Sequence, residues 1–362
     1  MDELEYDLPP SAIAVRPADP RDHSRLMVVH RGARAVEHRR FFEIGEYLRA
    51  GDLLVVNETR VLKAKVLLRR KSGAAIGGLF VRERGPGVWE MMLRTRGRAK
   101  KGEELVAGEY RFLLEGHVGE IREGLWRVKV SPEKSAPVIL AEIGAMPLPP
   151  YIERRRSAIL EQPGAHAPEN PGDAAWYQTV YARPEGRSVA APTAGLHFTP
   201  QLLERLTQSG IARAGVELDV GPGTFLPVEA ATLEEHSMHT EHYRVPPETA
   251  AAIQKTRAAG GRIITVGTTA VRTLETAAEK ILENSPPAEI SGDTALKISP
   301  GYSFRLTDVL LTNFHLPRST LMALVAAFLG GDGVGRLKAL YAEAIREGYR
   351  FYSYGDAMLI VP

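Results

Sequence analysis

The stretch SVAAPTAGLHFT, residues 188–199, decides how the surrounding chain folds. Residues 189–191 are typical of the end of a buried strand, and Pro192 ends that strand. Thr199 followed by Pro200 predicts an N-cap and the first residue of a helix. Open α/β sheets bind ligands beyond the carboxyl ends of their strands, so this loop predicts a site, with an ordinary connection as the alternative. Its candidate residues are Thr193, Gly195 and His197.

Strands and helices alternate on both sides of this stretch. Helices are predicted at 200–209, 248–259, 270–280, 320–329 and 336–347. Strands are predicted between them at 216–220, 262–267, 309–312 and 357–361. Upstream, RLMVVHR and DLLVVNETR are predicted as strands around a helix at 44–49. The alternation predicts an α/β fold with a mostly parallel sheet and helices on both faces.

Residues 61–156 follow a different pattern. The runs GGLFVRE, VWEMMLR, YRFLLEG and LWRVKVS are short, apolar or aromatic, and separated by turns that contain glycine. Such runs predict a small antiparallel sheet or barrel, and no helix is predicted among them. We therefore expect a discontinuous α/β catalytic domain of residues 1–60 plus 157–362, with an antiparallel β-barrel domain of residues 61–156 inserted into it.

The inserted segment is also the basic part of the chain. It carries 20 Lys and Arg against 11 Glu, a net charge of +9, whereas the remaining 26 basic and 33 acidic residues give −7. This asymmetry favours a module that binds a polyanion, although a single basic run is also typical of a solvated loop. The densest run, RTRGRAKK, contains Arg94, Arg96, Arg98, Lys100 and Lys101.

Several classes of protein are excluded or disfavoured by what the sequence lacks. It has no cysteine, which excludes disulfides, thiolate metal sites and a cysteine nucleophile. It has no Gly-rich dinucleotide fingerprint after a strand and no P-loop. No apolar run approaches the ~20 residues that span a bilayer, and the acidic start MDELEYDLPP lacks signal-peptide features, so we expect a cytoplasmic protein. The stretch EEHSMHTEH lacks the H-E-x-x-H spacing, so no metal site is predicted from its His236, His239, Glu241 and His242.

Four further segments of the α/β part place polar residues near the ends of strands. They supply Gly223, Thr224 and Phe225 in GPGTF, Thr268, Thr269, Arg272 and Glu275 in GTTAVRTLE, Asn313 and His315 in TNFHLPRST, and Tyr354 and Asp356 in YSYGDAMLI. A helix N-terminus suits a substrate carboxylate, although a threonine there also serves as an N-cap. We expect the loops around Gly195, Gly223, Thr269 and His315 to line one pocket.

Long motifs spread over the chain carry a family resemblance. In order they are YDLPPSAIAVRPADPRDHSRLMVV, GDLLVVNETRV, MPLPPYI, WYQTVYA, SVAAPTAGLHFT, HSMHTE, VGTTAVRTLE, PGYSF, LTNFHLPRSTLMALV and YRFYSYGDAMLI. Together they resemble the S-adenosylmethionine:tRNA ribosyltransferase-isomerase family of queuosine biosynthesis. The chain departs from the usual family pattern at Asp219, Pro222 and Leu226, where the family has His, Leu and Arg, and at Asp293, where it has an aromatic residue.

The resemblance implies an enzyme that transfers the ribosyl part of S-adenosylmethionine rather than its methyl group. The acceptor would be 7-aminomethyl-7-deazaguanine at the wobble position of a tRNA, the product epoxyqueuosine, and the leaving groups adenine and methionine. S-adenosylmethionine would be a consumed co-substrate, with no metal or redox cofactor. The implied partners are the precursor-bearing tRNA and S-adenosylmethionine, with no membrane, and we expect a monomer.

The candidate residues then receive expected roles. His197 is the first choice for proton transfer, with Glu275 and Asp356 as alternatives. The methionine carboxylate is assigned to Thr268, Thr269 and Arg272, and stacking to Phe198, Phe225 and Tyr354. Substrate contacts are also expected from Thr193, Gly195, Gly223, Thr224, Asn313 and His315. For tRNA we expect the run 94–101, with Arg16, Arg21 and Arg25 as the alternative surface.

Two other functions compete with the transferase. One is a non-catalytic RNA-binding β module carried on an α/β scaffold. The other is a hydrolase that uses His197 with Ser188 or Thr193, although no G-x-S-x-G elbow is present. Only the transferase explains why polar groups gather at the strand ends of the α/β part.

Overall fold

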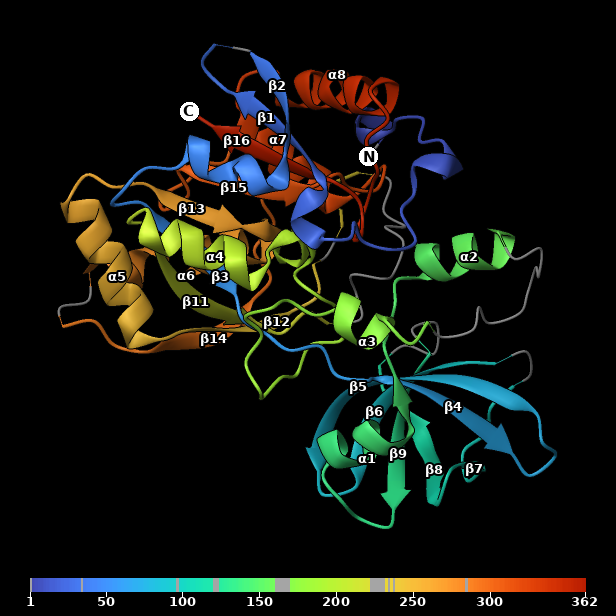
Figure 1. Ribbon diagram of the computed structural model, residues 1–362. Helices are drawn as coiled ribbons and strands as arrows, with labels where there is room; N and C mark the ends of the chain where they lie inside the picture. Colours follow the sequence, from blue (N-terminus) through green and yellow to red (C-terminus); the bar gives the residue numbers. More distant parts are fainter. Residues whose placement is uncertain are drawn as a thin grey trace.

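The computed structural model describes residues 2–33, 35–95, 98–119, 124–159, 170–221, 232–233, 235–236, 238–283 and 286–362. Figure 1 shows two units, an α/β unit built on a large sheet and a β-barrel beside it. The chain before residue 58 and the chain after α2 meet in the α/β unit, and the barrel is formed from the segment between β3 and α2.

The α/β unit is built on a nine-stranded sheet. Its strands, in spatial order, are β14 (Ile290–Thr294), β12 (Glu241–Val245), β11 (Ala212–Leu218), β3 (Leu53–Asn57), β13 (Ile263–Val266), β15 (Val309–Asn313), β16 (Ala357–Val361), β1 (Arg25–His30) and β2 (Val36–Arg40). The pairs β11–β3, β3–β13, β13–β15 and β16–β1 are parallel. The remaining neighbours are antiparallel, so the predicted α/β fold is confirmed with a sheet of mixed direction.

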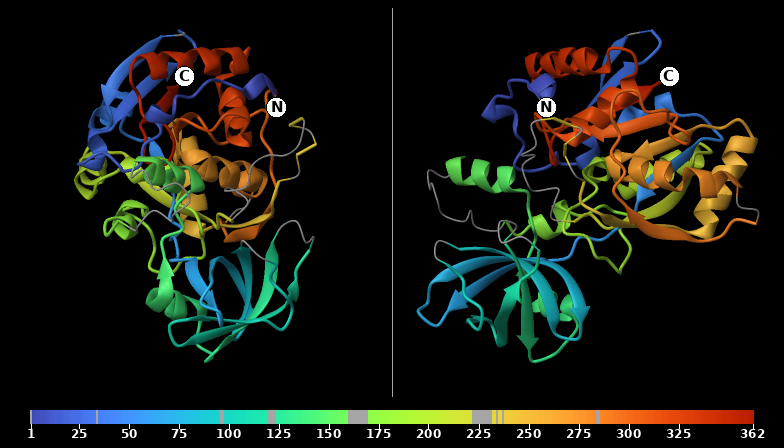
Figure 2. Two further views of the ribbon diagram at one scale, coloured as in Figure 1. Left: turned by 90° about the vertical axis from the view of Figure 1, so that its right-hand side faces the viewer. Right: turned by 180° about the vertical axis from the view of Figure 1, so that it is seen from behind.

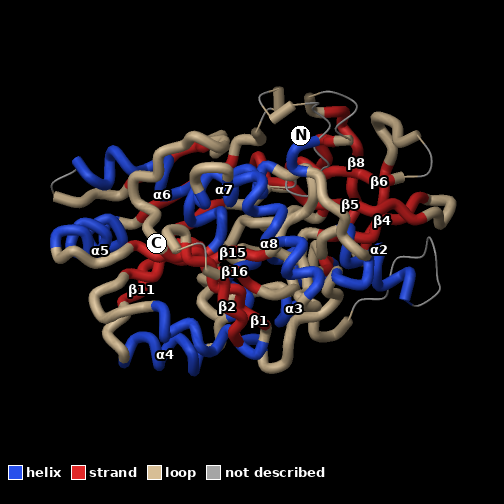
Figure 3. The backbone as a smooth tube through the Cα atoms, turned by 90° about the horizontal axis from the view of Figure 1, so that it is seen from above, coloured by secondary structure: helices blue, strands red, loops and turns tan. Residues whose placement is uncertain are grey.

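Helices cover both faces of this sheet. One face is covered by η4 (Phe41–Tyr47), η6 (Thr193–His197) and α4 (Pro200–Gln208), and the other by α5 (Pro247–Ala258), α6 (Gly267–Glu283), α7 (Thr320–Leu329) and α8 (Gly333–Arg346). Successive residues of a strand point to opposite faces, so in β3 Leu54 and Val56 pack with α4 while Leu53 and Val55 pack with α5 and α6. In Figure 3, α6 and α7 lie on one side of the strands and α4 on the other.

Three strands of the sheet are not in the sequence prediction. β2, β12 and β14 lie at or next to the two edges, and their sequences VEHRR, EHYRV and ISGDT are too polar to read as buried strands. The helix predicted at 44–49 is the 3₁₀ segment η4, which begins and ends earlier. Antiparallel edge strands with one solvated face therefore escape a search for apolar runs.

The second unit is an antiparallel barrel closed by pairing of its first and fourth strands. Its strands are β4 (Lys65–Arg70), β5 (Ala75–Gly85), β6 (Val88–Arg94), β7 (Glu104–Ala107), β8 (Tyr110–His117) and β9 (Leu125–Ser131), with β4 pairing with β7 and the short β10 (Gly144–Ala145) added to β4. Trp89 fills its core, edge-to-face with Phe80 and Phe112 at ring separations of 5.0 and 5.7 Å. The predicted barrel is therefore confirmed.

The expectation of no helix between residues 61 and 156 is wrong. Helix α1 (Ala136–Ile143) packs Ile139 and Leu140 into the barrel core, and α2 (Pro150–Ile159) follows it. The run APVILAEI is apolar on several sides, and so short an apolar run does not distinguish a helix from a strand. α2 carries the partly buried Arg156, whose guanidinium binds both carboxylate oxygens of Asp173 in α3 (Asp173–Trp176) at 2.7 and 2.8 Å.

The barrel is attached at the carboxyl-terminal edge of the central strands. The chain leaves β3 after Asn57, and Val61 forms an isolated bridge with Ser188 on its way to β4. The incoming and outgoing connections pack together with Ala191, Leu196 and Tyr354 in one apolar cluster. Figures 1 and 2 show the barrel below this edge from three sides.

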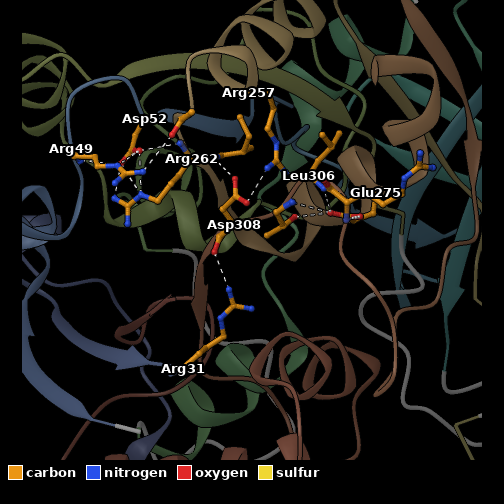
Figure 4. A network of polar contacts seen from close by, with 12 residues as sticks. Arg31, Arg49, Asp52, Arg257, Arg262, Glu275, Leu306 and Asp308 are labelled. Atoms are coloured by element: carbon orange, nitrogen blue, oxygen red, sulfur yellow. Dashed lines mark hydrogen bonds and ion pairs between the residues drawn. The ribbon is translucent and has the colours of Figure 1, made fainter. Parts of the chain in front are cut away.

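Carboxylates close the opposite, amino-terminal edge of the sheet (Figure 4). Asp52, directly before β3, accepts hydrogen bonds from the Arg262 side chain at 2.6 Å and from the Arg49 amide at 2.9 Å. Burial raises the pKa of Asp52, but these hydrogen bonds outweigh it and the pKa is lowered. Asp308, directly before β15, accepts from the Ile263 amide at 2.7 Å. The charged groups at this edge are committed to backbone and arginine partners.

Among the described residues, no single helix is long and apolar enough to cross a membrane. α7 and α8 meet the length and composition criteria only as a pair, and the chain bends by 106° between them.

Candidate active site

Three of the predicted loops meet at the carboxyl-terminal edge of the sheet. The Thr193 hydroxyl donates to Oδ1 of Asn313, the last residue of β15, at 3.0 Å. An ideal Cβ on Gly267 would lie 3.5 Å from Cβ of Ala194 and 3.6 Å from Oγ1 of Thr269. η6, the start of α6 and the end of β15 are thus direct neighbours. His315 follows Asn313 by two residues, while Gly223, Thr224 and Phe225 lie outside the described residues.

His197 is the centre of a buried polar network at this edge. Its Nδ1 lies 2.9 Å from Oγ of Ser24, and its Nε2 lies 3.1 Å from Nδ2 of Asn313. Because Nδ2 also donates to the carbonyl of Tyr352 at 3.2 Å, the amide nitrogen faces the ring and Nε2 accepts. Nδ1 therefore carries the proton and donates to Ser24. The ring also stacks on Phe41, with centroids 5.0 Å apart.

This environment holds His197 neutral. Burial, together with the positive charges of Arg350 and Arg21, lowers its pKa to about 3. A neutral imidazole with both nitrogens engaged is a weak base, so the contacts favour a positioning role over the proton-transfer role expected from sequence. Through its bond to Asn313, His197 fixes the end of β15 against η6.

His315 is the second buried histidine of the edge. Its Nε2 hydrogen-bonds to Oγ1 of Thr312 at 2.7 Å, and its backbone amide donates to the Tyr341 hydroxyl at 2.9 Å. Burial lowers its pKa to about 4. Its Nε2 thus has a partner within the protein, as both ring nitrogens of His197 have.

The two histidines are expected to destabilise the fold as the pH falls. In the unfolded chain each binds a proton near pH 6.5, whereas in the folded chain His197 and His315 stay neutral down to about 3 and about 4. The unfolded state therefore binds more protons below pH 6.5, and between pH 6.5 and 5 the pair should remove about 3–4 kcal/mol from the free energy of unfolding. Urea denaturation at several pH values measures this. His315→Gln should roughly halve the slope, whereas His239→Gln, on the surface, should leave it unchanged. An unaltered slope in His315→Gln would contradict the assignment.

Arg272 lies in the second turn of α6 and presents an unused donor. Its Nε donates to the carbonyl of Leu296 at 3.1 Å, and its Nη1 pairs with the Glu241 carboxylate. Within the part of the chain that the structure describes, its Nη2 is buried without a hydrogen-bond partner. Oγ1 of Thr269, one turn earlier, is also buried and unpartnered in that part, whereas Thr268 is buried beside it. These two donors suit an anionic group at the helix start.

Glu241 connects Arg272 to the loop after β11. Its second carboxylate oxygen accepts from the Gly221 amide at 3.1 Å. Sequence reasoning noticed Glu241 only as part of a histidine-rich stretch. Its neighbour His242 turns to Asp293 instead, with Nδ1 3.0 Å from the carboxylate. No group of three or more metal-binding side chains is found among the described residues.

Glu275, a predicted alternative for proton transfer, lies away from this edge. Its carboxylate accepts from the backbone amides of Arg305, Leu306 and Thr307 at 2.8, 3.1 and 3.1 Å (Figure 4). This segment leads into the amino end of β15, and Glu275 itself is about 12 Å along α6 from Gly267. The contacts favour a structural role, because three backbone amides and the Thr307 hydroxyl engage its carboxylate.

Asp356 lies at the correct edge but is fully occupied. It accepts from the backbone amides of Arg25 at 2.9 Å and of Arg350 at 2.7 Å. Its side chain is 2% exposed, so the carboxylate joins the starts of β1 and β16 and has no face toward a ligand. The contacts therefore favour a structural role here too.

Two predicted stacking residues are packed inside the protein. Phe198 is fully buried edge-to-face against Phe41, with centroids 5.0 Å apart. Tyr354 is 1% exposed and packs against Tyr177. The rings have no free face for a purine. Gly195 has a clear steric role, since an ideal Cβ there would lie 1.9 Å from the Tyr181 hydroxyl.

The predicted nucleic-acid residues divide into free and engaged groups. Exposed on the barrel are Arg94, Arg98, Lys100 and Lys101, and exposed on the α/β unit is Arg16, while Arg96 lies outside the described residues. Arg21 is engaged, because its guanidinium donates to the carbonyls of Gln178, at 2.8 Å, and Ala175. Arg25 donates to the carbonyl of Glu347 and lies 3.9 Å over the Tyr349 ring. The two engaged arginines hold loops of the α/β unit together.

Several residues of the edge were missed from sequence. Ser24 precedes β1 and lies in the motif YDLPPSAIAVRPADPRDHSRLMVV, which entered the family resemblance without a role for it, although it binds His197. Thr179 and Tyr181 lie in the segment WYQTVYA, which entered the family resemblance without a role. Their hydroxyls are buried and unpartnered in the described part of the chain. A hydroxyl-rich aromatic segment between two loops is the signal that could have singled them out.

The fold and the edge define an α/β enzyme with an inserted β-barrel, and comparison with known proteins gives its family. The family model described as queuosine biosynthesis protein matches residues 1–360. The chain is 47% identical over 359 residues to the S-adenosylmethionine:tRNA ribosyltransferase-isomerase of Thermotoga maritima, covering 99% of both chains. It is 45% identical over 366 residues to that of Moorella thermoacetica, covering 100% of this chain and 99% of the other.

A solved structure supports the same assignment. The crystal structure of the S-adenosylmethionine tRNA ribosyltransferase from Thermotoga maritima superposes with a TM-score of 0.54 at 38% identity, covering 99% of this chain and all of the other. The chain therefore belongs to the S-adenosylmethionine:tRNA ribosyltransferase-isomerase family of queuosine biosynthesis.

Proposed function

We propose that this protein transfers and isomerises the ribosyl moiety of S-adenosylmethionine onto 7-aminomethyl-7-deazaguanine at the wobble position of tRNA. The product is epoxyqueuosine, and adenine and methionine are released. Membership of the family over residues 1–360 supports the reaction. The position of its site is inferred from the buried donors of Arg272 and Thr269 at the carboxyl-terminal edge, which have no hydrogen-bond partner among the described residues. A tRNA substrate implies a cytoplasmic location.

The chemistry needs proton transfer and charge control at this edge. The sulfonium acidifies the adjacent 5′ carbon, so a base removes a proton there. Adenine departs with a proton, the precursor amine adds to the ribosyl carbons, and an alkoxide oxygen of the ribosyl group displaces methionine from the 5′ carbon as the epoxide closes. The methionyl carboxylate would bind Nη2 of Arg272 and Oγ1 of Thr269, since an arginine donor pairs strongly with a carboxylate. His197 keeps Asn313 and Thr193 in place beside it as a neutral hydrogen-bonding group. Proton transfer by His197 would require Asn313 to release Nε2.

The hydrolase alternative is disfavoured by two contacts. Nδ1 of His197 donates to Ser24, so Ser24 is not activated as a nucleophile. The Ser188 hydroxyl lies 2.9 Å from Oγ1 of Thr59 and accepts from the Val220 amide at 2.8 Å, while Thr193 donates to Asn313. Neither predicted nucleophile contacts the imidazole.

The proposed reaction is tested by product release. Purified protein with S-adenosylmethionine and precursor-bearing tRNA is expected to release adenine and methionine in equal amounts. Omitting the tRNA, or using tRNA with unmodified guanine, is the control. Release of adenine at the same rate in both controls, or methyl transfer to the tRNA, would reject the proposed reaction.

We further propose that the barrel binds the tRNA backbone while the wobble base enters the edge of the sheet. β4 begins beside the connections to the α/β unit and extends about 17 Å to Arg70. Nη2 of Arg70 donates to the carbonyl of Arg98 at 3.2 Å, which fixes the basic loop at the far end of that strand. A base held at the sheet edge thus leaves neighbouring phosphates within reach of the loop.

Neutralising the exposed loop cations is expected to weaken tRNA binding and its dependence on salt. The variant replaces Arg94, Arg98, Lys100 and Lys101 with glutamine. Each lost phosphate contact should reduce the log–log salt slope by about 0.7–0.9, whereas affinity for S-adenosylmethionine should stay unchanged. The matched control replaces the same number of exposed cations on the helices, namely Arg205, Lys255, Lys280 and Arg346. A salt slope equal to wild type in the loop variant would place the tRNA elsewhere, with the exposed Arg16 as the next candidate.

A further inference from the structure

Two hydroxyls that have no hydrogen-bond partner among the described residues lie against η6 at Gly195. Tyr181 is 8% exposed and Thr179 is 4% exposed, and neither hydroxyl has a hydrogen-bond partner in the part of the chain that the structure describes. The Tyr181 hydroxyl lies 1.9 Å from an ideal Cβ on Gly195, and Cγ2 of Thr179 lies 3.0 Å from the same point. Both side chains therefore meet at the backbone of Gly195, inside the loop that the sequence singled out.

The segment that carries these hydroxyls is rigidly held. Nη1 of Arg21 donates to the carbonyl of Gln178 at 2.8 Å. The Gln178 side chain binds both backbone groups of Val61, at 3.1 and 3.2 Å. Arg183 pairs with Glu58 at 2.8 Å just beyond Tyr181. A segment anchored at three points keeps two buried hydroxyls fixed without satisfying them, and a buried polar group left unpaired is costly.

The two hydroxyls are neutral groups, and the charged side chains that act on Tyr181 are Arg213 and Glu58, of which Glu58 is paired with Arg183. The nearest cation given for Tyr181 is Arg213, whose guanidinium carbon lies 5.8 Å from the ring centre. Burial raises the pKa of Tyr181, so its hydroxyl stays neutral and available as a donor. Neutral hydroxyls suit sugar hydroxyls or purine nitrogens, whereas a carboxylate or phosphate favours the guanidinium at Arg272.

Building on the proposed function, we propose that Thr179 and Tyr181 bind the uncharged nucleoside half of S-adenosylmethionine. Ala194 faces Gly267 and Thr269, and the next residue, Gly195, faces Tyr181 and Thr179. η6 thus separates a charged subsite at the start of α6 from a neutral subsite at residues 179–181. The substrate lies across η6 with its methionyl end toward Arg272 and its ribosyl and adenine parts toward Tyr181.

Calorimetric titration with adenosine and with S-adenosylmethionine tests this division. Tyr181→Phe and Thr179→Val should each weaken both ligands by about 5- to 20-fold, the loss expected for one hydrogen bond to an otherwise unpaired group. Their Tm should not fall, because no protein hydrogen bond is removed. Arg272→Lys should weaken S-adenosylmethionine and leave adenosine unchanged. Tyr349→Phe is the control, since it removes the 2.8 Å contact to His38 and should lower the Tm without changing either affinity.

Unchanged adenosine affinity in Tyr181→Phe and Thr179→Val would overturn the subsite, as would a wild-type protein with no measurable affinity for adenosine. The proposed reaction is judged separately by adenine release from wild type with precursor-bearing tRNA. If wild type releases adenine and neither substitution changes the affinity for adenosine, the proposed reaction stands and the proposed subsite is rejected. A protein that releases none loses the reaction and, with it, the subsite.

Discussion

Replacing His197 with alanine is expected to lower turnover about 100-fold or more. The substitution removes the acceptor for Nδ2 of Asn313 and the donor to Ser24, so the end of β15 loses its fixed position against η6. Misplacement of site groups by about 1 Å has an effect of this size. Single-turnover kinetics with precursor-bearing tRNA measures the change, and circular dichroism checks that the variant is folded.

His197→Gln separates positioning from proton transfer. A glutamine oxygen accepts from Asn313 as Nε2 does, so the positioning role predicts that turnover recovers to within about tenfold of wild type. Wild type and His197→Gln should show the same pH profile between pH 5 and 8. Burial and two nearby arginines hold the pKa of His197 at about 3, so this residue adds no inflection in that range. If glutamine is as inactive as alanine while the fold is intact, His197 transfers the proton.

Replacing Glu275 with alanine is expected to lower the free energy of unfolding by about 3–5 kcal/mol. The change leaves the buried amides of Leu306 and Thr307 without their acceptor, and the Arg305 amide loses a charged partner. Urea denaturation at neutral pH measures the loss. Glu275→Gln keeps an acceptor oxygen and should lose less.

The same variants decide the role of Glu275. At low temperature, where Glu275→Gln stays folded, its affinity for S-adenosylmethionine and its turnover should be close to those of wild type. Normal stability combined with lost turnover would instead make Glu275 the proton-transfer group and contradict its structural role.

The architecture was predictable where buried strands give continuous apolar runs in the sequence. β3, β13 and β15 are buried on both faces, so their apolar runs stand out, and the carboxyl ends of parallel strands necessarily share an edge. That rule placed Thr269 and Asn313 at one edge. The strand expected at residues 189–191 is not formed, and Thr193 reaches the same edge as the first residue of η6. Polar strands at or next to an edge, such as β12, give no continuous apolar run and were missed. The helix α1 was missed because its apolar run is too short to distinguish a helix from a strand.

The roles of single side chains were less predictable, because they depend on partners distant in sequence. Asp356 is placed at the right edge by its strand, yet the amides of Arg25 and Arg350 occupy it. Phe198 follows the loop correctly but turns into the core against Phe41. Tyr181 gained a candidate role only when Gly195 was found against its hydroxyl. Sequence thus indicated a candidate edge of the sheet, and tertiary contacts show which of its side chains already have partners.

A crystal structure of the protein with S-adenosylmethionine tests the central claim most directly. We predict the ligand at the carboxyl-terminal edge of the sheet, with its carboxylate about 3 Å from Nη2 of Arg272 or Oγ1 of Thr269 and its ribosyl group against Gly195. A ligand bound within the barrel, or at the opposite edge beside Asp52 and Asp308, would contradict the account.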